Sequence, residues 1–122
     1  MDSKLAVVVV PVSDVDRSRH FYRAAGFRLD RDDARGRELR VVQLTPPGSA
    51  CSILIGTGLT SAPPGSCQGL HLVVDDVEAA RAELAGRGVA ISDVVRDSVF
   101  RHDFASFADP DGNGWIVEQL TR

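Results

Sequence analysis

The pattern of hydrophobic and polar residues along this chain occurs twice, in two similar repeats. The stretches "VSDVDRSRHFYRAAGF", which begins at Val12, and "VDDVEAARAELAGRGV", which begins at Val74, align without a gap. In each stretch a β-branched run leads to an acidic residue that can cap a helix, apolar residues follow at spacings of i, i+3 and i+7, and a glycine marks the end. The sequence therefore predicts two copies of one unit, each with a strand followed by an amphipathic helix.

Three shorter strand-like segments follow each predicted helix. They are "FRLDRD", "ELRVVQL" and "CSILIG" in the first copy and "AISDVVRD", "DFASFA" and "GWIVEQL" in the second. Turn residues separate the segments within each copy. The pattern predicts one α+β domain of two tandem βαβββ modules, with module one at residues 1–56, a Gly-, Pro- and Ser-rich linker at residues 57–68, and module two at residues 69–122.

Composition excludes several classes of function. A chain of 122 residues is long enough to bury a core without a disulfide or a structural metal. The net charge of -3 creates no field that attracts nucleic acid, and the run "LAVVVVPV" is too short to span a membrane. The first residues lack a signal-peptide pattern, so we expect a cytoplasmic protein in which Cys51 and Cys67 are free thiols.

The stretch "FADPDGNGWIVEQ", from Phe107 to Gln119, places a dense turn signal before an apolar strand. Pro110 fixes φ, Asp111 and Asn113 can bond their own backbone, and Gly112 tolerates a positive φ. The strand then carries a carboxylate, Glu118, whose role the turn pattern leaves open.

Three stretches together resemble the vicinal oxygen chelate superfamily, which includes glyoxalase I, extradiol dioxygenases and bleomycin resistance proteins. They are "VPVSDVDRSRHFYRAAGF", "LVVDDVEAARAELAGRGV" and "FADPDGNGWIVEQ", and the resemblance covers nearly the whole chain. It implies paired βαβββ modules whose sheets curl around a cleft, usually in a homodimer, which is also the common form of small soluble oligomers. The superfamily spans lyases, oxygenases, transferases and plain binding proteins, so the fold does not fix the function.

The resemblance also implies where a metal would be held. Metal-using members place His, Glu or Gln at up to four strand positions, which correspond here to Val7, Ser52, Gly69 and Ile116. A divalent transition ion needs three or four N, O or S donors at about 2.0 to 2.3 Å. Valine, glycine and isoleucine supply none, so we expect no metal and no other cofactor. A divalent metal remains the alternative if the strand register is shifted by two residues.

A shift of two residues would place two polar residues at the metal positions, because strand residues two apart share a face. His71 shares a face with Gly69, and Glu118 with Ile116. The pair is compatible with a remnant metal site, with general acid and base catalysis, or with anchoring a polar ligand. It is equally compatible with a buried, hydrogen-bonded histidine and a half-exposed glutamate at a strand end.

Apolar residues on the same strands favour a binding cleft for a small molecule. The segment "RDSVFRHDFASF" adds Phe100 and His102, either as the rim of that cleft or as a solvated hairpin. The predicted ligand-binding residues are Val7, Val9, Ser52, Leu54, His71, Phe100, His102, Ile116 and Glu118. We expect a metal-free binding protein like the drug-sequestering members of the superfamily. The alternative is a glyoxalase-like lyase or isomerase, or a dioxygenase, that uses His71 and Glu118 in catalysis.

Overall fold

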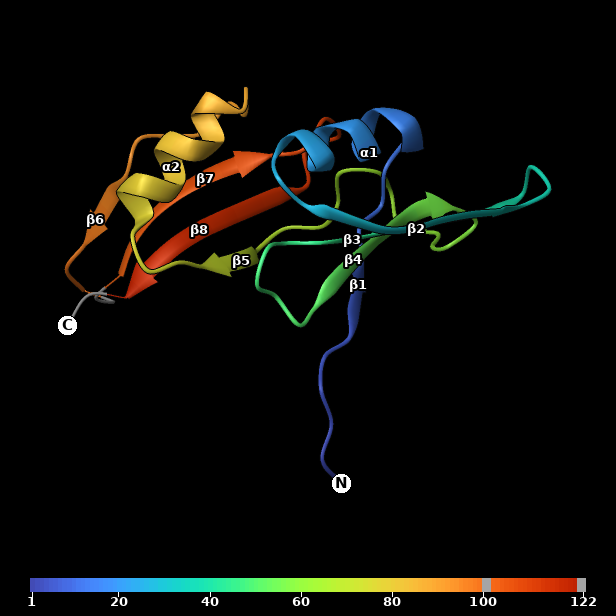
Figure 1. Cartoon of the computed structure of the whole chain (residues 1–122), viewed down its shortest axis with the longest axis horizontal. Helices are drawn as coiled ribbons and strands as arrows, with labels where there is room; N and C mark the ends of the chain where they lie inside the picture. The colour runs from blue at the N-terminus through green and yellow to red at the C-terminus, as the bar shows by residue number, and fades with distance from the viewer. Residues whose placement is uncertain (100–101, 121–122) are drawn as a thin grey trace.

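The computed structural model describes residues 1–99 and 102–120, and it contains two four-stranded sheets with one helix packed on each (Figure 1). The elements of the first module are β1 (Val7–Val9), α1 (Val15–Ala24), β2 (Arg28–Arg35), β3 (Leu39–Thr45) and β4 (Ser52–Thr57). Those of the second are β5 (Leu70–Val73), α2 (Val77–Gly86), β6 (Val95–Asp97), β7 (His102–Ala108) and β8 (Gly114–Leu120). The predicted α+β class and the repeated βαβββ order are confirmed.

The two sheets have the same topology. Sheet A has the order β1-β4-β3-β2 and sheet B the order β5-β8-β7-β6. In each, the first strand runs parallel to the last, and the other neighbours are antiparallel. Each sheet therefore has an edge strand, β1 or β5, that precedes its helix.

Strand pairing corrects the alignment of the two modules. Val9 lies opposite Leu54 in sheet A, and its counterpart His71 lies opposite Ile116 in sheet B. The counterpart of Ile116 is therefore Leu54, whereas the family motif, aligned through the turn glycines, points to Ser52. The reason is a two-residue excess after the turn glycine. Four residues, "SACS", separate Gly48 from Ile53, whereas two, "NG", separate Gly112 from Trp115, the counterpart of Ile53.

Both helices begin at the aspartates that the sequence predicts as caps. The Asp14 carboxylate accepts from the backbone N–H of Arg17 at 3.0 Å, and the Asp76 carboxylate accepts from that of Ala79 at 3.1 Å. Each bond satisfies one of the free N–H groups of a first helical turn. The two helices lie on the same side of the molecule, α1 against β3 and β4 and α2 against β7 and β8.

Aromatic side chains link the two halves of the core. Tyr22 of α1 is fully buried, and its ring contacts those of Phe27 and Trp115 with centroids 5.2 and 5.8 Å apart. Trp115 also stacks on Phe107 at 5.9 Å. Trp115 and Tyr22 therefore pack in the core between module one and module two.

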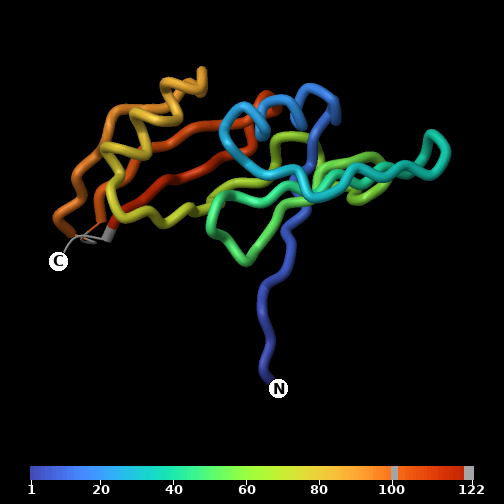
Figure 2. The backbone as a smooth tube through the Cα atoms, viewed as in Figure 1, coloured from blue at the N-terminus to red at the C-terminus, as the bar shows by residue number. Residues whose placement is uncertain are grey.

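The face of each sheet that points away from its helix is uncovered, and we call it the open face. On sheet A it carries Val7, Val9, Val41, Gln43, Thr45, Ser52 and Leu54. On sheet B it carries His71, Val73, Val95, His102, Phe104, Ile116 and Glu118. Residues 1–6 extend away from the rest of the fold (Figure 2). Within the described ranges no helix has the length and apolarity needed to cross a membrane.

Candidate functional site

The turn before β8 is built around Asp109. Its carboxylate accepts from the backbone N–H groups of Asp111 and Asn113, both at 3.0 Å, and from the side-chain amide of Asn113 at 2.8 Å. The expectation that Asp111 and Asn113 satisfy the turn is therefore wrong, because Asp109 is the local acceptor. Gly112 adopts a φ of 94°, as the turn pattern predicts.

The other polar groups of this turn hold distant segments together. Asn113 donates to the carbonyl of Pro11 at 2.8 Å and accepts from the backbone N–H of Cys67 at 3.0 Å. The carboxylate of Asp111 accepts from both the backbone N–H and the hydroxyl of Ser13. The turn thus connects module two to the start of module one and to the linker, which gives the motif a structural role.

Tyr22 completes this connection inside the core. Its hydroxyl donates to Asp109 at 2.8 Å and accepts from the indole N–H of Trp115 at 3.0 Å. Burial and the neighbouring Asp109 charge both raise the pKa of Tyr22 far above its usual value. The hydroxyl therefore stays protonated and donates at any physiological pH.

On sheet B, a carboxylate lies between two imidazoles. Glu118 Oε1 is 2.7 Å from His71 Nδ1, and Glu118 Oε2 is 3.9 Å from His102 Nε2. The His71 side chain is 49% exposed, whereas that of Glu118 is only 14% exposed. The interpretation of His71 as a buried histidine is therefore wrong, because the open face of sheet B has no covering layer.

An aromatic ring lies beside this group. The rings of His102 and Phe104 are 5.4 Å apart with an interplanar angle of 32°. Ile116, which lies opposite His71, is half-buried on the same face. Phe100, the remaining residue predicted for this rim, lies outside the described residues.

On sheet A, the predicted residues Val7, Val9 and Leu54 form an apolar strip on the two neighbouring strands β1 and β4. Ser52 lies at the end of the same strip but is nearly fully buried. Its hydroxyl is 2.6 Å from that of Thr45, and the Gln43 amide donates to it at 3.3 Å. The polar part of this face thus depends on Gln43 and Thr45, which the sequence analysis missed. A glutamine within an otherwise apolar strand is the signal that could have found them.

The four positions that the family resemblance assigns to a metal do not supply a ligand set. Val7, Gly69 and Ile116 have no side-chain donor, and the Ser52 hydroxyl already bonds Thr45. With the corrected pairing, Leu54 replaces Ser52 and removes even that oxygen. Across residues 1–99 and 102–120, no three His, Cys, Asp or Glu side chains are grouped so that they could hold a metal ion.

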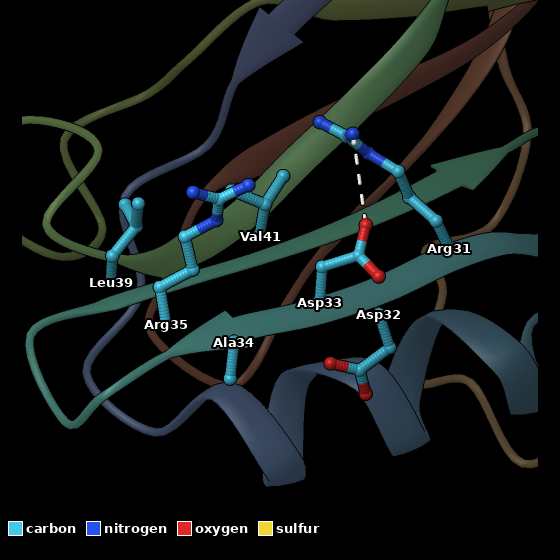
Figure 3. Close-up of a pocket in the computed structure, with 7 residues that line it drawn as sticks. All are labelled: Arg31, Asp32, Asp33, Ala34, Arg35, Leu39 and Val41. Atoms are coloured by element: carbon cyan, nitrogen blue, oxygen red, sulfur yellow. Dashed lines mark ion pairs between the residues drawn. The ribbon is translucent and has the colours of Figure 1, made fainter.

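A hollow of about 550 Å³ continues the open face of sheet A along the β2–β3 hairpin (Figure 3). Arg31, Asp33 and Arg35 point to the side of the hairpin away from α1, together with Leu39 and Val41. Arg31 and Asp33 form an ion pair at 3.7 Å. A second hollow of about 480 Å³ lies between the modules, and its lining includes His71, Val73 and residues 46–49.

The model of the Glyoxalase/Bleomycin resistance protein/Dioxygenase superfamily matches residues 4–117. The chain belongs to this superfamily. The match covers both modules, including the two capped helices and the turn before β8. Among curated proteins, none matches the chain.

Solved structures of this superfamily have the same fold. TnmS3, an antibiotic binding protein from Streptomyces sp. CB03234, is 35% identical, with 98% of each chain covered and a TM-score of 0.82. A glyoxalase/bleomycin resistance protein from the same organism is 34% identical, with 97% of this chain and 100% of that chain covered and a TM-score of 0.75. A superfamily member from Sphaerobacter thermophilus DSM 20745 is 24% identical with a TM-score of 0.81, which shows the fold alone.

Proposed function

We propose that this protein binds a largely apolar small molecule without a metal and releases it unchanged, as a sequestering protein of the cytoplasm. The open faces of both sheets present aliphatic side chains beside a few polar groups, which is the composition of a small-molecule site. The similarity to an antibiotic binding protein over nearly the full length supports this class of function.

One observation carries the proposal. At the positions where metal-using members of the superfamily hold their ion, this chain has valine, glycine, isoleucine and either serine or leucine. Valine, isoleucine, leucine and glycine have no side-chain donor to replace the water ligands of a divalent ion, and a lone serine hydroxyl is a poor ligand. The aliphatic side chains can instead pack against carbon. The same cleft surface is therefore suited to hydrophobic contact.

We propose further that the ligand cleft is closed by a second copy of the chain in a homodimer. Val73 is 69% exposed and Val95 is 48% exposed on the open face of sheet B, and Val7 is 38% exposed on sheet A. Exposed apolar side chains on both open faces can supply contacts to a second copy. Leu5 in the extended segment 1–6 is 71% exposed and offers an additional apolar contact.

The proposal is tested by titrating protein dialysed against EDTA with doxorubicin, 1-hydroxypyrene and 1-methoxypyrene in a calorimeter. We expect at least one of these ligands to bind with one site per chain and to be recovered with its mass unchanged. Binding that appears only after a divalent metal is added contradicts the metal-free proposal, and the absence of binding by all three contradicts the binding function.

A second candidate function is acid–base catalysis, which the 2.7 Å contact between His71 and Glu118 favours. This geometry is within the range for proton transfer between a histidine and its orienting carboxylate. Incubation with bound ligand should then yield a product that chromatography separates from the ligand in the wild type, and none in His71→Ala or Glu118→Gln. His20→Ala is the matched control, because His20 is exposed on α1 away from the open faces.

A further inference from the structure

Five side chains on the open face of sheet A form one continuous hydrogen-bonded relay. They are Arg28, Asp30, Thr45, Ser52 and Gln43. Arg28 Nε is 2.6 Å from Asp30, the Thr45 hydroxyl donates to the other oxygen of Asp30, and the Ser52 hydroxyl is 2.6 Å from that of Thr45. The Gln43 amide closes the relay with a 3.3 Å bond to Ser52.

A bulge in β2 lies at Asp30. The pairing of β2 with β3 shifts between Leu29 and Arg31, so that Asp30 stands outside the regular register. Asp30 is two residues after Arg28, which pairs with Thr45, so strand alternation places its side chain on the open face. There its carboxylate accepts from the hydroxyl of Thr45.

The hydrogen bonds of the relay can be donated in only one direction along it. The Thr45 hydrogen bond and the Arg28 guanidinium both lower the pKa of Asp30, so the group is a carboxylate that only accepts. Thr45 must use its single proton on Asp30, and Ser52 must use its proton on Thr45. The oxygen of Ser52 then has only acceptor capacity left, so Gln43 turns its Nε2 toward Ser52.

This direction fixes which end of the Gln43 amide is free. No residue of the described ranges 1–99 and 102–120 donates to Gln43 Oε1. Thr45 and Ser52 are nearly fully buried, whereas Gln43 is half-buried and lies between Arg31 on β2 and Leu54 on β4. Arg31 and the adjacent Val41 line the 550 Å³ hollow of Figure 3.

We infer that Gln43 determines ligand specificity at this face, and that it selects largely apolar molecules bearing a hydroxyl or N–H donor because the relay leaves its carbonyl oxygen free to accept. This inference rests on the proposed binding function and adds the hydrogen-bonding class of the ligand. Thr45 and Asp30 are positioning residues that act through Gln43 without touching the ligand.

The test compares 1-hydroxypyrene, which donates a hydrogen bond, with 1-methoxypyrene, which does not. Their fluorescence is titrated with wild-type protein, Thr45→Val, Asp30→Asn and Gln43→Met at pH 7. We expect the wild type to bind the hydroxyl compound about fivefold more tightly, as one net hydrogen bond provides. Gln43→Met should lose this preference because it has no acceptor.

Thr45→Val provides the decisive comparison. It removes the acceptor of the Ser52 hydroxyl, which then donates to Gln43 Oε1, so that the amide turns over and presents Nε2. The preference for 1-hydroxypyrene should fall below about twofold, although Gln43, the residue that contacts the ligand, is not substituted. Asp30→Asn should act in the same direction, because its amide can donate to Thr45 and reverse the relay.

Thr57→Val is the matched control, since Thr57 is exposed at the end of β4 and outside the relay. It should keep the fivefold preference. Equal binding of both pyrenes by the wild type, or an unchanged preference in folded Thr45→Val and Asp30→Asn, overturns the inference and leaves the binding function standing. Failure of the wild type to bind either pyrene overturns the inference, and it overturns the binding function as well if doxorubicin also fails to bind.

Discussion

Substitution of Tyr22 by phenylalanine tests whether the buried connection between the modules stabilises the fold. The change removes one oxygen that donates to Asp109 at 2.8 Å and accepts from Trp115 at 3.0 Å. All three side chains are at most 5% exposed, so water cannot replace the lost partner without local opening. The ring itself and its aromatic contacts are retained.

The expected cost follows from the two bonds. A hydrogen bond to a charged group contributes about 1.5 to 3 kcal/mol, and an unpaired buried indole N–H adds about 1 kcal/mol or more. We therefore expect Tyr22→Phe to lower the free energy of unfolding by about 3 kcal/mol. At about 4 °C per kcal/mol for a chain of this length, the midpoint should fall by about 12 °C.

Urea unfolding at fixed protein concentration measures this cost, with Ser18→Ala as the matched control on the same helix. Ser18 is fully buried, and its Oγ has no hydrogen-bond partner in the described part of the chain. Removing that hydroxyl should leave stability unchanged or raise it slightly. The reasoning is refuted if Tyr22→Phe costs no more than Ser18→Ala.

Two further changes probe the acidic groups and the turns. Arg40 lowers the pKa of Asp32, so this pair stabilises the fold above the unfolded carboxylate pKa of about 3.9, and the contribution is lost as pH falls through the folded value. Asp32→Asn should therefore lower stability at pH 7, and this effect should shrink progressively as pH falls below about 3.9 in urea titrations. Gly65→Ala should destabilise by about 2 kcal/mol more than Gly48→Ala. Both glycines have a positive φ, but a Cβ at Gly65 would lie 2.1 Å from the carbonyl oxygen of Asp111, and one at Gly48 meets nothing within 4 Å. Equal losses in thermal melts would contradict the steric argument.

Much of the fold is predictable from local sequence. The duplicated stretches fix the element order, and the helix starts at Asp14 and Asp76 follow from capping alone. Strand alternation also places His71 and Glu118 on one face, where the structure joins them at 2.7 Å. These features depend on residues close in sequence or on simple periodicity.

The remaining features depend on contacts between distant segments. Asp109 and Asp111 look alike in the turn, and only the approach of Tyr22 and Ser13 from module one separates their roles. Likewise, the relay to Gln43 requires contacts between Asp30, Thr45 and Ser52, which lie on three different strands. A single sequence does not encode these juxtapositions in its local pattern.

Native mass spectrometry of the EDTA-dialysed protein with 1-hydroxypyrene is the most direct test of metal-free binding. We predict a dimer of the 13.1 kDa chain that carries the pyrene at its unaltered mass and no metal ion. A complex that forms only with a stoichiometric divalent metal, or a bound species of changed mass, would contradict the account.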